Sequence, residues 1–256
     1  MISASRKLLN AALMTAAVAL GGCSLTDDKN ADFAVEEIVP ADALYNQALA
    51  NLDSGDLGTA QKRIDDLNRQ HPYSEYSRRS LILDTFINYR QGKYAEATTS
   101  GRRFISLYPA DKDAAYAQYI IGMSYYKQMP HITRDQSVAQ KSYNAMASLV
   151  EKYPESEYVE DAKAKMRITQ DQLAGKDMLV GRYYQERREF LAAINRFRKV
   201  VENYPSTRHV EEALARLTES YFSLGLIEEA QNSAAVLGHN FPDSKWYQES
   251  YQLLQT

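Results

Sequence analysis

Glycine and proline are scarce in this chain, with 11 and 7 residues among 256. Sandwiches and barrels need frequent turn residues, so the scarcity favours an all-α protein. A single cysteine excludes an intrachain disulfide, and the four histidines (His71, His131, His209 and His239) form no short pairing of the kind that binds metals. We therefore expect no metal and no cofactor. A formal net charge of −3 argues against general nucleic-acid binding.

The amino-terminal segment, residues 1–22, has the anatomy of a secretory signal peptide. Arg6 and Lys7 precede the apolar run Leu8–Leu20. This run of 13 residues would extend about 20 Å as a helix, which is too short to span a bilayer core of about 30 Å. The residues that follow, Leu20-Gly21-Gly22-Cys23, resemble the bacterial lipobox.

The lipobox resemblance implies that Cys23 is lipidated after the segment before it is removed, which would anchor the chain in a membrane. Ser24 stands where an aspartate would retain a lipoprotein at the inner membrane. The resemblance therefore implies the periplasmic face of the outer membrane. The alternative is an ordinary cleaved signal with a chance cysteine. Residues 23–42 are polar and acidic, so we interpret them as a flexible tether.

The rest of the sequence repeats one four-residue pattern built around a proline. The five copies are His71-Pro72-Tyr73-Ser74, Tyr108-Pro109-Ala110-Asp111, Tyr153-Pro154-Glu155-Ser156, Tyr204-Pro205-Ser206-Thr207 and Phe241-Pro242-Asp243-Ser244. Their prolines lie 37, 45, 51 and 37 residues apart, close to the period of paired-helix repeats. Each proline ends a helix because it lacks an amide donor, and the Ser, Thr or Asp after it can cap the next helix.

The residues before these prolines match the tetratricopeptide pattern of small and aromatic positions. The best match, in the fourth repeat, consists of Gly181, Tyr184, Ala193, Phe197 and Pro205. The glycines expected to form the turn inside a helix pair are Gly55, Gly92 and Gly225. The sequence therefore predicts an all-α, tetratricopeptide-like helical repeat superhelix of about five helix pairs.

The third repeat departs from this period. The stretch Gln128–Ser137 is an insertion before its second helix, and extra residues also separate repeats three and four. Because Ser156–Ala174 contains no strong helix breaker, we expect a long helix there that divides the array. Residues 43–174 would form an amino-terminal lobe and residues 175–256 a carboxy-terminal lobe.

The sequence carries no catalytic motif. It has no Gly-x-Ser-x-Gly, no glycine-rich phosphate loop and no His-Glu-x-x-His. Adjacent acidic residues such as Glu211-Glu212 point in different directions on a helix, so they do not form an acid–base pair. We expect a protein that is not an enzyme.

The segment after the first proline combines aromatic and cationic side chains. Tyr73, Tyr76, Arg78 and Arg79 lie within seven residues of one another. Such residues suit a groove for an extended peptide with a carboxylate or aromatic side chains. The alternative is that the tyrosines pack on the turn and the arginines are solvated.

Taken over the whole chain, the sequence resembles the BamD or competence lipoprotein (ComL) family of outer-membrane protein assembly factors. The residues that carry the resemblance are the lipobox, the segment from Leu44-Tyr45 to Tyr76-Ser77 with its turn at Pro72, Arg134-Asp135 in the insertion, Tyr183–Arg187 and Asn195-Arg196 ahead of Tyr204-Pro205. The resemblance implies a non-enzymatic scaffold that binds the periplasmic domains of the barrel insertase, other assembly lipoproteins and unfolded outer-membrane proteins. It also implies that the amino-terminal lobe binds substrate and the carboxy-terminal lobe binds the insertase.

In this family an arginine of the Asn-Arg motif is associated with the insertase contact, and Arg196 matches it. We expect Arg196 to pair with an acidic residue of the partner; the alternative is an exposed helix arginine. Two other functions fit parts of the sequence. One is a periplasmic repeat lipoprotein that organises peptidoglycan or cell-division enzymes. The other is an enzyme on a helical solenoid, for which the segment after Pro242 leaves too little room.

Overall fold

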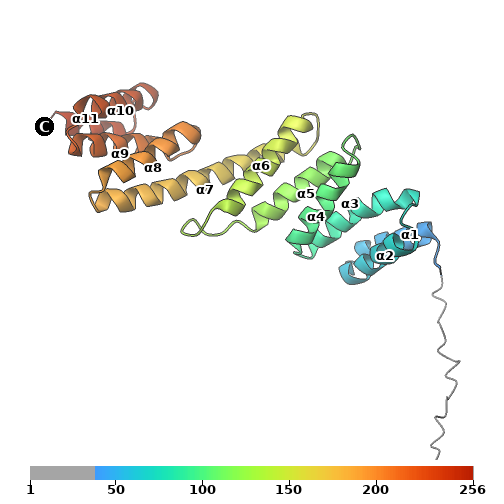
Figure 1. Ribbon diagram of the computed structural model, residues 1–256. Helices are drawn as coiled ribbons and strands as arrows, with labels where there is room; N and C mark the ends of the chain where they lie inside the picture. The colour runs from blue at the N-terminus through green and yellow to red at the C-terminus, as the bar shows by residue number, and fades with distance from the viewer. Residues whose placement is uncertain (1–37, 256) are drawn as a thin grey trace, which may run out of the picture. The chain divides into compact units, whose positions relative to one another are not determined.

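The computed structural model describes residues 38–255, which form eleven α-helices and no strand (Figure 1). The helices are α1 (Ala41–Asp53), α2 (Leu57–Gln70), α3 (Glu75–Arg90), α4 (Tyr94–Leu107), α5 (Ala114–Lys127), α6 (Ser137–Lys152), α7 (Val159–Glu186), α8 (Phe190–Asn203), α9 (Val210–Ser223), α10 (Ile227–Asn240) and α11 (Lys245–Leu254). All of them belong to one compact unit. The predicted signal peptide, Cys23 and most of the tether lie outside the described residues.

Each helix packs against the next one along the chain. The first helices of successive pairs also touch, α1 with α3, α3 with α5 and α5 with α7. This is the stacking of a paired-helix repeat, in which every pair buries its apolar stripe against a neighbour. The predicted all-α repeat fold with five helix pairs is confirmed. The sequence prediction missed α11, which packs against α9 and α10 as a single closing helix.

The turns inside the helix pairs confirm the glycine prediction. Gly55, Gly92 and Gly225 adopt φ angles of 83°, 75° and 74°, a left-handed conformation that glycine adopts without steric cost. The equivalent turn between α7 and α8 contains Arg188 at a φ of 59° instead. This residue is strained, because a side chain disfavours that region by roughly 1–2 kcal/mol.

The turns between pairs confirm the predicted capping only in part. Ser244 caps α11 by accepting a hydrogen bond from the Trp246 N–H. Asp111 and Ser156 instead accept from the N–H two residues on, before the helix begins. These two side chains stabilise the turn itself, so the helix starts later than the sequence pattern indicates.

The apolar stripes of the second helices are buried as their spacing predicts. Ala193, Phe197 and Val200 on α8 are fully buried. Phe197 lies so close to Gly181 on α7 that a Cβ added there would be 2.5 Å from the ring. A glycine is therefore required where these two helices cross.

The predicted long helix is also confirmed, and it is longer than expected. α7 contains 28 residues and continues through residue 174 without a break. It therefore joins the extra segment to the first helix of the fourth repeat. The division into a substrate lobe and an insertase lobe stays a prediction.

One contact between helix pairs occurs twice in the same register. Arg102 on α4 donates to the Tyr125 hydroxyl at 2.6 Å, and Arg198 on α8 donates to the Tyr221 hydroxyl at 2.7 Å. Both arginines lie 23 residues before their tyrosine. The repeats thus share a polar contact as well as an apolar stripe.

Replacing Gly181 with alanine should lower the free energy of unfolding by about 1–3 kcal/mol, because the new methyl group overpacks the Phe197 ring. Urea unfolding measured by circular dichroism checks this. Gly58→Ala is the matched control, since a Cβ there would meet only an ordinary contact at 3.6 Å. Equal stability of the two variants would contradict the close crossing of α7 and α8.

Candidate functional site

A pocket of about 350 Å³ lies where α1, α3 and α4 meet the loop before α5. Its lining residues are Tyr45, Arg78, Arg79, Ile82, Phe104, Asp111, Lys112 and Asp113. Three cations and two carboxylates thus surround an aromatic and aliphatic floor. Such a combination suits a ligand that has both an apolar side chain and a negative charge.

The aromatic side of this pocket is built by side chains from two repeats. The ring of Tyr76 on α3 lies 5.4 Å from the ring of Tyr45 on α1. The guanidinium of Arg79 lies 6.0 Å from the Tyr76 ring centroid. Burial raises the pKa of Tyr45. Both arginines are exposed at the pocket mouth, where Arg78 pairs with Asp111 at 3.1 Å.

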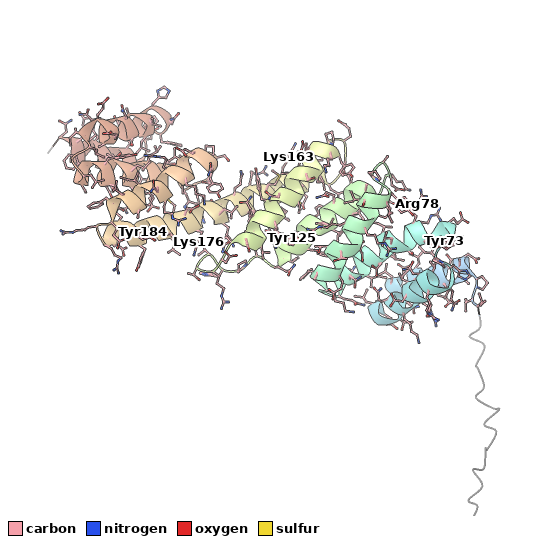
Figure 2. All side chains as sticks on the ribbon, in the orientation of Figure 1. Tyr73, Arg78, Tyr125, Lys163, Lys176 and Tyr184 are labelled. Atoms are coloured by element: carbon pink, nitrogen blue, oxygen red, sulfur yellow. The ribbon has the colours of Figure 1, made fainter. Side chains whose placement is uncertain are left out.

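The structure brings together three of the four predicted peptide-binding residues, and it separates the fourth. Tyr76, Arg78 and Arg79 lie in or beside the pocket. Tyr73 is fully exposed on the turn before α3 and does not line it (Figure 2). The sequence analysis did not assign Tyr45 to this cluster, because Tyr45 stands about 30 residues before it and reaches it only through the packing of α1 on α3.

An array of aromatic rings continues from the pocket along α3 and across α5 to Tyr158, the residue before α7. Phe86 lies one helical turn beyond the pocket residue Ile82, and its ring is 6.3 Å from that of Tyr116. The ring of Tyr158 lies 5.4 Å from Tyr116 and 4.9 Å from Tyr119. These rings are half-buried, so part of each remains available for contacts.

Two tyrosines of this array have strongly perturbed hydroxyl groups. Burial, with the neighbouring Tyr158, raises the pKa of Tyr116 to about 12. Burial also raises the pKa of Tyr119, whose hydroxyl donates to Asp161 at 2.7 Å. That hydrogen bond in turn lowers the pKa of Asp161.

The second site is a buried aspartate in the middle of α7. The side chain of Asp177 is only 6% exposed. Arg196 contacts its Oδ1 at 3.1 Å, and Lys199 contacts its Oδ2 at 2.8 Å. A buried carboxylate without such partners would be strongly destabilising, so the pairing of Asp177 with Arg196 and Lys199 stabilises the fold.

Arg196, the predicted docking residue, is therefore already in an ion pair within the chain. Its side chain is nonetheless 43% exposed, so the guanidinium is accessible from solvent. The sequence analysis missed Asp177, because an aspartate in a polar stretch of helix carries no sequence signal of burial. Asp177 and Arg196 come close together because α7 and α8 cross at Gly181.

No three His, Cys, Asp or Glu side chains within residues 38–255 are grouped as a metal site. None of the helices in that range is long and apolar enough to cross a membrane.

A sequence profile of the YfiO family, described as outer membrane lipoprotein, matches residues 38–237. The chain belongs to this family. Its relatives include the outer membrane protein assembly factor BamD of Caulobacter vibrioides, 40% identical over 97% of this chain and 81% of that protein. The protein of the same name from Rickettsia prowazekii is 37% identical over 97% of both chains. The family resemblance stated from the sequence is thus confirmed.

Among solved structures, the TPR2AB domain of yeast Sti1 in its pHSP90 complex aligns with a TM-score of 0.42. It is 13% identical, over 84% of this chain and 83% of that chain.

Stability should fall as the pH rises above about 10, the ordinary pKa of tyrosine. The folded chain keeps the Tyr116 proton up to a pKa of about 12, whereas the unfolded chain loses it near 10. Between these two pKa values the chain releases a proton when it unfolds, so raising the pH in this range favours the unfolded state. Urea unfolding at a series of alkaline pH values measures the slope.

Tyr116→Phe should make this slope shallower, because the variant removes one of the shifted hydroxyl groups. Tyr73→Phe is the matched control, since Tyr73 is fully exposed in the folded chain. The same slope in Tyr116→Phe and the wild type would contradict the burial of the Tyr116 hydroxyl.

Proposed function

We propose that this chain is a non-enzymatic lipoprotein scaffold for the assembly of β-barrel proteins in the outer membrane. Family membership and the shared name of its relatives support this role. Lipid on Cys23 would hold the chain at the periplasmic face of the outer membrane. Its partners would be the periplasmic domains of the barrel insertase, other assembly lipoproteins and unfolded outer-membrane proteins.

The pocket beside Tyr76 is the observation that carries the substrate proposal. A strand of a membrane barrel alternates apolar and polar side chains and carries aromatic residues near its ends. A strand at the end of the chain also carries the free terminal carboxylate. The Tyr45–Tyr76 ring pair offers an aromatic surface, and Arg79 and Lys112 offer cations. Asp111 and Asp113 limit the net charge of the pocket, so the attraction for a carboxylate is moderate.

Moderate affinity suits this role. An unfolded segment loses conformational entropy when it docks, and a scaffold must release it for insertion. A shallow pocket at the surface, with arginines already held by Tyr76 and Asp111, exchanges ligand without rearranging the repeats. The aromatic array through Phe86 and Tyr116 extends the surface on which a longer segment would lie.

The insertase would dock at the Asp177–Arg196 centre. Asp177 orients the Arg196 guanidinium, and Lys199 holds the second carboxylate oxygen. Arg196 can therefore turn an exposed edge toward an acidic partner residue while Asp177 stays neutralised. A preorganised guanidinium loses less entropy on binding than a free one.

Arg79→Gln should weaken binding of a peptide that represents the last strand of an outer-membrane barrel by about tenfold, because one charge-assisted contact is lost. Fluorescence anisotropy with a labelled synthetic peptide measures the dissociation constant. The same peptide with an amidated carboxyl end should bind the wild type and Arg79→Gln equally weakly.

Arg103→Gln is the matched control for that experiment, since Arg103 is exposed on α4 and does not line the pocket. Tyr73→Ala should also leave the affinity unchanged. If Arg79→Gln binds the peptide as the wild type does, the pocket is not the substrate site.

Arg196→Glu should abolish recovery of the insertase in a mild-detergent pull-down of the tagged, lipidated chain from outer membranes. Charge reversal places two carboxylates together and removes the cation that the partner would contact. Arg198→Glu is the matched control, because Arg198 lies two residues away and contacts Tyr221 instead of Asp177. Mass spectrometry identifies the recovered proteins.

Recovery of peptidoglycan or cell-division enzymes in place of an insertase would support the alternative adaptor role.

The variant Asp177→Asn tests whether Asp177 helps docking by orienting Arg196 or opposes it by its negative charge. Removal of a negative charge beside Arg196 would by itself strengthen attraction to an acidic partner. We expect Asp177→Asn to weaken insertase docking instead, because Arg196 then loses the carboxylate that orients its guanidinium.

A further inference from the structure

The loop between α5 and α6, which lies within the predicted insertion Gln128–Ser137, packs on the middle of α7. Gln172 Nε2 donates to the Pro130 carbonyl at 2.6 Å. Lys176 Nζ donates to the Thr133 carbonyl at 3.0 Å. Figure 2 shows Lys176 beside the loop that joins α5 to α6. Two α7 side chains thus fasten the loop to the helix.

The loop is also braced from inside. Buried Gln136 donates to the carbonyls of His131 and Arg134 at 3.0 and 3.1 Å and accepts from Gln172 at 2.7 Å. Ile132 lies against Gly175, where an added Cβ would be 2.6 Å from its side chain. A loop whose carbonyls are satisfied by side chains holds one shape, so its tip is preorganised for binding.

The tip of this loop is open to solvent. Thr133, Arg134 and Asp135 are all exposed. Within residues 38–255, the Arg134 guanidinium has no ion-pair partner. A rigid loop that presents an unpaired arginine at its tip is suited to contact a negatively charged group.

The α7 face that carries the loop continues as an exposed aromatic and cationic surface. Tyr183 and Arg187 follow Lys176 by seven and eleven residues, so the three share one helix face over about 16 Å. Tyr183 is 54% exposed, and the Arg187 guanidinium lies 5.3 Å from its ring centroid. Arg187 also pairs through Nε with the exposed Glu189 at 3.2 Å, which leaves its terminal N–H groups for a partner. We call the surface made by Arg134, Lys176, Tyr183 and Arg187 the α7 stripe.

The turn after α7 contains two arginines and two glutamates. Arg188, at a φ of 59°, follows Arg187 where the equivalent turns have glycine, and Glu186 and Glu189 flank the two arginines. With Arg134, Asp135 and the half-buried Lys176, the charged side chains along the stripe sum to a small positive charge. This charge complements an acidic partner.

We propose that the α7 stripe is a docking surface for an acidic protein segment that also carries an aromatic side chain to pack on Tyr183. The partner belongs to the assembly machinery, and in this respect the inference rests on the proposed function. Arg134 and Arg187 hold carboxylates at the two ends of the stripe, and Tyr183 binds the ring between them. The stripe binds independently of Arg196, which faces Asp177.

A labelled synthetic peptide with one tryptophan between two runs of three glutamates is the probe. Fluorescence anisotropy measures its binding to the full-length lipidated chain in detergent. We expect saturable binding that weakens as salt is added. Tyr183→Ala and Arg134→Glu should each raise the dissociation constant about tenfold.

Tyr251→Ala is the matched control for Tyr183, because its side chain is also 54% exposed but lies on α11. Arg103→Glu, on α4, is the control for Arg134. Both should bind the peptide as the wild type does. Unchanged circular dichroism on heating verifies that each variant is folded.

Absence of binding to the wild type would overturn the inference, and so would equal affinities of Tyr183→Ala, Arg134→Glu and their controls. Neither result affects insertase recovery, which depends on Arg196. Conversely, loss of insertase docking with retained, Tyr183-dependent peptide binding would leave the α7 stripe in place.

Discussion

The close crossing of paired helices is the constraint on which the rest of this fold depends. Each second helix buries an apolar stripe, and in the third and fourth pairs a glycine of the first helix leaves room for the crossing. Gly181 lies against Phe197 in the fourth repeat, and Gly122 lies against Met146 in the third. An interior packed this closely has few alternative arrangements. The side chains on its surface are therefore held in fixed positions relative to one another.

The unbroken length of α7 fixes the spacing of several features of the array. Because no breaker interrupts it, one helix of 28 residues contributes Asp177 to the ion-pair centre and Tyr183 to the open stripe, and it begins directly after Tyr158 of the aromatic array. The loop between α5 and α6 is hydrogen-bonded to the middle of the same helix. A continuous backbone fixes the spacing of these features along its axis.

The sequence predicts those parts of the structure that depend on local chemistry. Prolines end helices and glycines form turns wherever they stand, so Gly55 and Pro72 are recognisable without coordinates. The sequence does not predict Asp177 or Tyr45, because their roles arise from helix packing between residues about 20 to 30 positions apart. Arg188 escapes prediction for another reason, since its strain is visible only in the backbone angle. Sites built across repeats are therefore less predictable than the repeats themselves.

This arrangement favours a scaffold that acts by colocalisation. Allosteric coupling between two sites needs an element with two alternative arrangements. The helix that connects the pocket side of the array to the Asp177–Arg196 centre is instead uninterrupted, and its crossings are tightly packed. A rigid scaffold still promotes transfer, because a segment held weakly near its acceptor has an effective concentration on the order of millimolar. Under the proposed function, weak binding and a fixed geometry would then be sufficient to pass an unfolded strand to a docked partner.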